Sequence, residues 1–87
     1  MPPKNKIKEL RNEIDSIDDR IIELLEERAL VSKYIGKIKQ NFEKEVLDTE
    51  REKEIIDRLA QKTKILNRET LRLIYDNIFK VSRKIQS

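Results

Sequence analysis

Residues 7–39, IKELRNEIDSIDDRIIELLEERALVSKYIGKIK, decide the fold of this 87-residue chain. A regular apolar pattern runs through this stretch, and Arg28 holds its only position without an aliphatic residue. The apolar residues recur in alternating steps of three and four, at Ile7, Leu10, Ile14, Ile17, Ile21, Leu24, Val31, Ile35 and Ile38. This a/d spacing is typical of a long amphipathic helix. We therefore predict one helix over residues 6–40, although Gly36 inside it costs about 1 kcal/mol relative to Ala.

A second, shorter helix is predicted after a loop. The segment Gln40–Leu47 breaks the apolar register and is expected to form that loop. Asp48 and Thr49 are both good N-cap residues, and the sequence Thr49-Glu50-Arg51-Glu52 fits a capping box. The helix should cover residues 48–62, with a buried stripe of Ile55, Ile56 and Leu59.

A third helix is predicted over residues 67–86. Asn67 is a plausible N-cap, and the apolar face should consist of Leu71, Ile74, Ile78, Val81 and Ile85. Residues 1–5 are expected to be disordered, and residues 6–87 to form a single domain. The predicted fold class is therefore all-α, with three helices per chain.

Composition excludes several classes of function. Cys and His are both absent, which removes disulfides, thiol catalysis, the common zinc sites and imidazole acid–base chemistry. The net charge of +3 is the difference between 20 basic and 17 acidic residues, and the two kinds intermix along the helices. A nucleic-acid partner is therefore not expected. No apolar run approaches the roughly 20 residues that span a membrane, and the N-terminus lacks a signal-peptide core, so we expect a cytoplasmic protein.

The length of the first helix predicts self-association. At 1.5 Å per residue this helix is about 50 Å long, whereas a compact chain of this size is only about 30 Å across. Its apolar stripe continues from end to end. A second copy of the chain, related by a two-fold axis, is the simplest cover for the part that overhangs.

Three basic residues of the first helix admit two interpretations each. Arg28 in apolar register either sets the helix register or, together with Lys39 nearly three turns later, faces a pocket that holds an anion. Arg11 is either a solvated surface residue or a ligand to such an anion. It lies about 42 Å before Lys39 along the helix, so it could join Lys39 only across an antiparallel dimer.

Polar residues of the other two helices are also open to two interpretations. Asp48 and Glu52 complement the helix dipole without any further role, but Arg51 in the same first turn is mildly unfavourable there. Ser82 and Gln86 are spaced i, i+4 and share one face of the third helix. A polar pair near a C-terminus most often faces water.

Taken together in order, these residues resemble the all-helical (AroQ class) chorismate mutases. The resemblance covers nearly the whole chain. Its motifs are Leu10-Arg11, Ile14-Asp15-x-x-Asp18, Leu24-Leu25-x-x-Arg28, Gly36-Lys37-x-Lys39, Asp48-x-x-Arg51-Glu52 and Ser82-x-x-x-Gln86. Each motif alone is weak, but the ordered set at matching separations is specific. The resemblance implies an intertwined helical homodimer that rearranges chorismate to prephenate, without a cofactor or metal.

The resemblance also implies roles for eight polar residues of the motifs. Arg28 with Ser82, and Arg11 of the partner subunit, would bind the substrate carboxylates, and Arg51 is a further cation suited to them. Lys39 and Gln86 would be the catalytic donors to the ether oxygen. Glu52 and the backbone near Asp48 would hold the ring hydroxyl group.

Two alternatives remain open at this point. An isochorismate pyruvate lyase shares the fold and much of the arginine pattern, although Asp48 and the Arg51-Glu52 pair suit the hydroxyl position of chorismate. A helical interaction or nucleic-acid-binding module without an active site would instead place its basic residues on one exposed stripe. Here they alternate with acids, as in Arg11–Asp15 and Arg20–Glu23.

Overall fold

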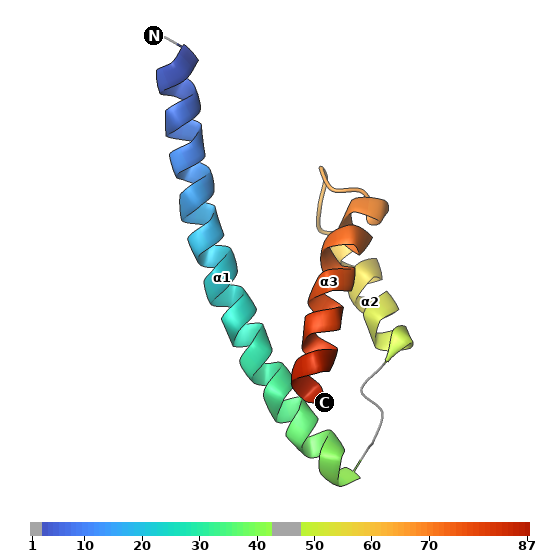
Figure 1. The fold of residues 1–87 in the computed structure, drawn as a ribbon. Helices are drawn as coiled ribbons and strands as arrows, with labels where there is room; N and C mark the ends of the chain where they lie inside the picture. The colour runs from blue at the N-terminus through green and yellow to red at the C-terminus, as the bar shows by residue number, and fades with distance from the viewer. Residues whose placement is uncertain (1–2, 43–47) are drawn as a thin grey trace. The chain divides into compact units, whose positions relative to one another are not determined.

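A computed structural model describes residues 3–42 and 48–87, and these residues form three α-helices (Figure 1). The helices are α1 (Pro3–Phe42), α2 (Thr49–Ala60) and α3 (Arg68–Gln86). None of the described residues lies in a strand. The predicted all-α class with three helices is therefore confirmed.

The long helix α1 is longer than predicted at both ends. It begins at Pro3, so residues 3–5, which were expected to be disordered, are helical. Proline favours the first position of a helix, because its φ is already helical and its missing N–H has no partner there. At the other end, residues 40–42 continue the helix. The rest of the predicted loop, residues 43–47, lies outside the described residues.

Both predicted N-caps of the shorter helices are present, but the capping box is not. The Asp48 carboxylate accepts a hydrogen bond from the Arg51 amide at 2.9 Å, so Asp48 is the N-cap of α2 and Thr49 its first helical residue. Because the box requires Thr49 at the cap, that prediction was wrong. The Asn67 side chain accepts from the Thr70 amide at 2.8 Å and caps α3 as predicted.

The chain divides into two compact units, residues 1–30 and 31–87, and the boundary falls inside α1. In the first unit the described residues form only helix. Its a/d side chains are exposed, namely Ile7, Leu10, Ile14, Ile17, Ile21 and Leu24. A row of exposed apolar residues of this kind marks an interaction surface.

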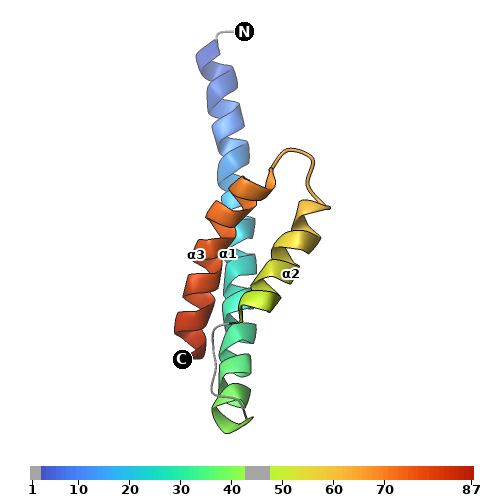
Figure 2. The same cartoon turned by 90° about the vertical axis from the view of Figure 1, so that its right-hand side faces the viewer.

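The second unit contains the core of the chain. Helices α2 and α3 lie side by side and run antiparallel (Figures 1 and 2), and the side chains between them are buried. The buried residues of this core are Ile55, Ile56, Leu71 and Phe79, with Leu59, Ala60 and Tyr75 packed against them. The predicted stripe of the second helix is therefore confirmed.

The buried face of α3 agrees only in part with the predicted one: Leu71 is buried as predicted, but so is Phe79, which was not predicted. Phe79 is only 2% exposed, and its ring lies 5.7 Å from that of Tyr75, whereas Ile74 and Val81 of the predicted stripe are exposed. Burial thus follows the row of residues 71, 75 and 79, four positions apart. A four-residue row on one helix runs obliquely to the axis and packs against the groove of another helix. The aliphatic residues left outside give α3 a second apolar face.

An ion pair joins α2 to α3 near their connection. The Arg68 guanidinium donates to the Asp57 carboxylate at 2.5 Å, and this hydrogen bond holds the pKa of Asp57 below its usual value of 3.8. A carboxylate with a depressed pKa stabilises the fold above its unfolded pKa and loses that contribution as pH falls through the folded value. Both side chains are well exposed, so solvent screening keeps the contribution small.

The Asp57→Asn variant should therefore be less stable than the wild type near neutral pH. This difference in unfolding free energy should shrink as pH falls below about 3.8, because Asp57 then becomes protonated and accepts poorly from Arg68. Urea unfolding followed by circular dichroism at several pH values measures the difference. A difference that stays constant down to the lowest pH would show that the pair contributes nothing through its charge.

No helix among the described residues is long and apolar enough to cross a membrane. In the same part of the chain, no three Asp or Glu side chains gather as a metal ion would require.

Candidate active site

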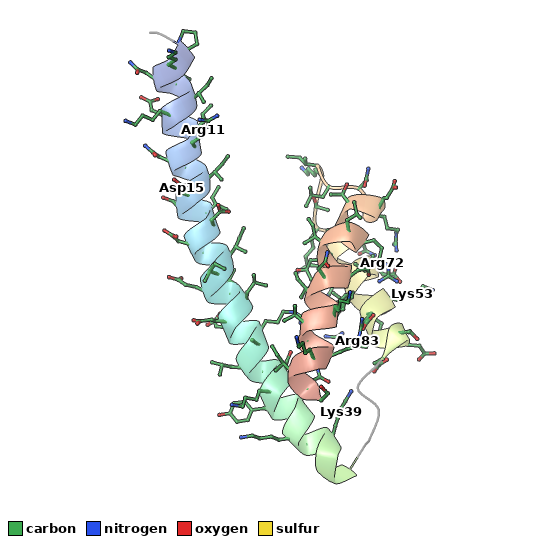
Figure 3. The ribbon with its side chains drawn as sticks, viewed as in Figure 1. Arg11, Asp15, Lys39, Lys53, Arg72 and Arg83 are labelled. Carbon is green, nitrogen blue, oxygen red and sulfur yellow. The ribbon has the colours of Figure 1, made fainter. Side chains whose placement is uncertain are left out.

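The predicted site residues are distributed over both units of the chain. Arg11 and Arg28 belong to the first unit, and Figure 3 shows Arg11 on the N-terminal part of α1. Arg11 is exposed and Arg28 is partly buried. The other six belong to the second unit, and they are Lys39, Asp48, Arg51, Glu52, Ser82 and Gln86.

The first turn of α2 presents Glu52 to α3. Its carboxylate accepts a hydrogen bond from the guanidinium of Arg83 at 2.5 Å. The Glu52 side chain is 17% exposed and that of Arg83 is 32% exposed, so this pair is more buried than the Asp57–Arg68 pair, whose side chains are 43% and 59% exposed. Charge-assisted bonds of this kind are among the stronger hydrogen bonds in proteins.

Arg83 was missed by the sequence analysis. It lies next to Ser82, four residues after the buried Phe79 and three residues before Gln86. Residues three and four apart share one face of a helix, so Arg83 lies on the same side of α3 as Phe79 and Gln86. This spacing could have indicated that Arg83 faces α2, but only once Phe79 was known to be buried.

Arg51 lies apart from the Glu52–Arg83 pair. Its guanidinium approaches the Glu54 carboxylate at 3.5 Å, and both side chains are exposed. Its backbone amide is held by Asp48, the N-cap of the helix. In the described chain, Arg51 thus contributes its backbone to the start of α2, and its side chain lies on the exposed surface.

Gly36 brings α1 against the last turn of α3. A Cβ atom built on Gly36 would lie 2.7 Å from both the Cα and the carbonyl oxygen of Gln86. Real Cβ atoms do not approach a backbone so closely, so only glycine fits here. The unfavourable glycine in the middle of the predicted helix is thereby explained: it lets two backbones touch. Ser32, one turn earlier, is buried as well.

The side chain of Gln86 is partly buried, and its amide oxygen is fully enclosed. Among the described residues this Oε1 atom has no hydrogen-bond partner. Leaving a buried acceptor unsatisfied costs about 1–3 kcal/mol, so such atoms are rare and call for an explanation. An amide also carries two N–H donors, which makes this side chain suited to a polar ligand.

Lys39 lies three residues after Gly36 and therefore on a neighbouring part of the same face of α1. It is partly buried, as are Ser82 and Gln86 on α3. The second unit thus contributes polar groups from all three helices: an amine, a hydroxyl group, an amide and the Glu52–Arg83 pair. None of these groups is an obvious nucleophile or a metal ligand set. They are suited to binding and orienting a polar, anionic molecule.

Residues 10–87 match the family described as chorismate mutase type II, and the chain belongs to that family. The resemblance inferred from the sequence motifs is thereby confirmed.

Two curated relatives match parts of the chain. One is the bifunctional chorismate mutase/prephenate dehydratase of Aquifex aeolicus, 40% identical over 74 residues, which are 85% of this chain and 18% of that protein. Another is the chorismate mutase of Methanocaldococcus jannaschii, 39% identical over 56 residues, which are 64% of this chain and 57% of that protein. This chain therefore spans less than two thirds of the length of either relative.

Two solved structures share the fold. The chorismate mutase of Helicobacter pylori, crystallised in complex with prephenate, has a TM-score of 0.87 and 38% sequence identity, over 94% of this chain and 90% of that one. A conserved hypothetical protein from Pyrococcus furiosus has a TM-score of 0.77 and 36% identity, over 94% of this chain and 96% of that one.

Proposed function

We propose that this chain is a chorismate mutase, which rearranges chorismate to prephenate on the route to phenylalanine and tyrosine. The observation that carries the proposal is the family match over residues 10–87. It is supported by the shared fold with the Helicobacter pylori enzyme, whose structure was solved in complex with prephenate. A cytoplasmic location remains a prediction from the sequence.

The reaction suits a protein without His or Cys. It is a unimolecular Claisen-type rearrangement, in which the carbon–oxygen bond of an ether breaks while a carbon–carbon bond forms within the same molecule. It needs neither a nucleophile nor a general base. The protein has to hold a dicarboxylate in its compact conformation and to aim hydrogen-bond donors at the ether oxygen, where negative charge develops.

The proposed roles follow the motifs of the family. Arg28 with Ser82, and Arg11 of the partner subunit, bind the two carboxylates, to which Arg51 is a further candidate cation. Guanidinium groups suit this task because they grip a planar carboxylate with two hydrogen bonds. Lys39 donates to the ether oxygen.

The remaining groups serve the ether oxygen and the ring hydroxyl group. Gln86 is the second donor to the ether oxygen, through the N–H groups of its partly buried amide. Glu52 and the backbone near Asp48 hold the hydroxyl group of the ring. Glu52 is held by Arg83 in the described chain and still has lone pairs for a second donor.

The functional unit is proposed to be a homodimer. The apolar stripe along the first unit of α1 is exposed in the single chain, and so are Val31, Ile35 and Ile38 further along the same register. A symmetric second copy would cover it and would bring Arg11 to the partner's site.

An assay of the purified chain with chorismate tests the function. Loss of chorismate should be accelerated over the spontaneous rate, with prephenate as the only product identified by mass spectrometry. Release of pyruvate from isochorismate would identify the chain as a lyase of the same fold instead. No acceleration of either reaction would favour an interaction module.

Gly36→Ala should lower kcat/KM at least tenfold while the helix content is retained. The added Cβ would collide with the backbone of Gln86, so the last turn of α3 must move and take the proposed donor with it. A misplacement of about 1 Å can cost 10²-fold in rate. Circular dichroism and steady-state kinetics measure the two effects.

Lys33→Ala provides the control for this variant, because Lys33 lies exposed on α1 one turn before Gly36. It should leave kcat/KM unchanged. Wild-type kinetics in Gly36→Ala would mean that the close approach of the two helices has no bearing on activity.

A further inference from the structure

The Glu52–Arg83 pair has a different environment from the other ion pair between α2 and α3. Both pairs join the same two helices with a distance of 2.5 Å. The Asp57–Arg68 pair lies near the connection and is largely exposed, at 43% and 59%. The Glu52–Arg83 pair is 17% and 32% exposed, and Arg83 lies next to the proposed site residue Ser82 and three residues before Gln86.

We propose that Arg83 is a positioning residue for Glu52: it holds the carboxylate in the orientation in which Glu52 accepts a hydrogen bond from the substrate. This inference rests on the proposed function. It adds to that function a residue that is not among the family motifs identified in the sequence.

A free glutamate side chain is a poor binding group because it has several rotamers. Fixing such a side chain when the ligand binds costs conformational entropy and lowers affinity. In this chain the hydrogen bond from Arg83 fixes Glu52 before the ligand arrives. The partial burial of both side chains reduces screening by salt, so this bond is less weakened than a surface pair would be.

The geometry of a carboxylate allows Glu52 to serve two donors. Arg83 donates to one oxygen, Oε2. A carboxylate has two oxygens with about four lone-pair sites in all, so a ligand hydroxyl group can donate to the other oxygen. Arg83 itself is anchored, because it lies one turn after Phe79, which is buried in the core between α2 and α3. The core therefore sets the position of Arg83, and Arg83 sets the position of Glu52.

The expected effect of Arg83→Gln is a fall in kcat/KM of roughly tenfold, within the range of measured couplings between contacting residues. The loss should appear mainly as a raised KM. The ring hydroxyl group does not react, so its contact with Glu52 is equally strong in the ground state and the transition state. Arg83→Lys keeps a cation in reach of Glu52 and should restore part of the loss.

A double-mutant cycle tests whether Arg83 acts through Glu52. The kinetics of the full chain are compared for the wild type, Arg83→Gln, Glu52→Gln and the double variant. If Arg83 only positions Glu52, then Arg83→Gln should change kcat/KM less than about twofold in the Glu52→Gln background. An equal loss in both backgrounds would overturn the proposal, because Arg83 would then act on the substrate directly or on the fold.

Arg68→Gln is the matched control, since it breaks the other ion pair between the same helices. It should leave kcat and KM unchanged, while urea unfolding measures the stability of both variants. If Arg68→Gln lowered kcat/KM as much as Arg83→Gln, the proposal would also be overturned. The effect of Arg83 would then be explained by its ion pair between the two helices alone. If the Arg83→Gln protein loses its helix content, Arg83→Lys takes its place in the cycle. Its effect on kcat/KM is then compared between the wild-type and Glu52→Gln backgrounds, with the same two outcomes.

These outcomes are separate from a failure of the proposed function. A wild-type chain that does not accelerate the loss of chorismate contradicts the function itself. An active wild type in which the Arg83 effect is independent of Glu52 contradicts only the positioning role.

Discussion

The Gln86→Glu variant is expected to lose roughly 10²- to 10³-fold in kcat at neutral pH, and to regain rate as the pH falls. The loss corresponds to about 3–4 kcal/mol, the effect of removing one oxyanion-hole donor in other enzymes. An amide donates at every pH, whereas the introduced carboxyl group donates only when protonated. When ionised, it places a negative charge against the ether oxygen just as that oxygen becomes negative.

The pH profile distinguishes this explanation from a damaged helix. Burial and the two charges of the substrate raise the pKa of the introduced carboxyl group, and Lys39 lowers it, so the midpoint reports their balance. The wild-type rate should vary little between about pH 5 and 8, a range clear of the ordinary pKa values of Asp, Glu and Lys. Only the variant should become dependent on acid.

Gln86→Ala is the control, because it removes the donor without adding a charge. It should be slow at every pH and show the flat profile of the wild type. Circular dichroism checks that α3 remains folded, since Gln86 is the last residue of that helix. A folded Gln86→Glu protein with a wild-type rate and a flat profile would show that Gln86 is not the donor.

Local rules predicted the helices well. The a/d pattern between Ile7 and Ile38 is long enough that no strand or loop could account for it, and the N-caps Asp48 and Asn67 lie where the sequence placed them. These features depend on residues close together in the chain. The errors at the ends of α1 amount to less than one turn and reflect the fact that a helix already formed extends at small cost.

Contacts between helices were the part that local rules missed. The sequence analysis chose aliphatic residues for the buried face of α3, whereas the packing against α2 buries Phe79. The same packing brings Arg83 to Glu52, a residue 31 positions away. Gly36 was counted as a local cost, and its contact with Gln86 depends on how two segments 50 residues apart meet. Such pairs depend on how the helices pack, and a short window of sequence does not include both residues of a pair.

The family motifs predict more than local rules do, because they group residues from distant parts of the chain into one site. They do not state which contacts position each side chain. They assigned Glu52 to the site, but not the cation that orients it. They also grouped Arg51 with the site, although in the described chain its side chain is exposed beside Glu54. If the Arg51 side chain turns toward a ligand, Arg51→Ala should raise KM.

The second large effect concerns the sharing of sites between subunits. Arg11→Ala and Arg28→Ala should each be nearly inactive alone, because each removes a proposed carboxylate ligand from both sites of the proposed dimer. Unfolded together and refolded as a mixture, they should recover activity. In a heterodimer, one site would carry both lesions and the other would be intact, so each heterodimer should reach about half of wild-type activity.

The expected recovery follows from the geometry of α1. Arg11 and Lys39 are 28 residues apart in the sequence, which corresponds to about 42 Å along an ideal helix and is too far for one small ligand. Arg11 can therefore serve a site that contains Lys39 only if the two come from different chains. The exposed apolar stripe from Ile7 to Leu24 is the surface that would bring those chains together. Sedimentation should show a dimer for the wild type and for each variant, and heterodimers are verified by a tag on one of the two chains.

The control mixture pairs Arg28→Ala with Lys39→Ala. Both residues are proposed to serve the site of their own chain, so each heterodimer would have one lesion in each site and should stay inactive. Recovery in the first mixture and none in the second would place Arg11 across the dimer from Arg28. If verified heterodimers of Arg11→Ala and Arg28→Ala stay inactive, the two arginines serve the same chain's site, and the shared-site arrangement is wrong. A monomer with full activity at assay concentration would contradict the arrangement more directly, because two residues 28 positions apart on one ideal helix are too far apart for one small substrate.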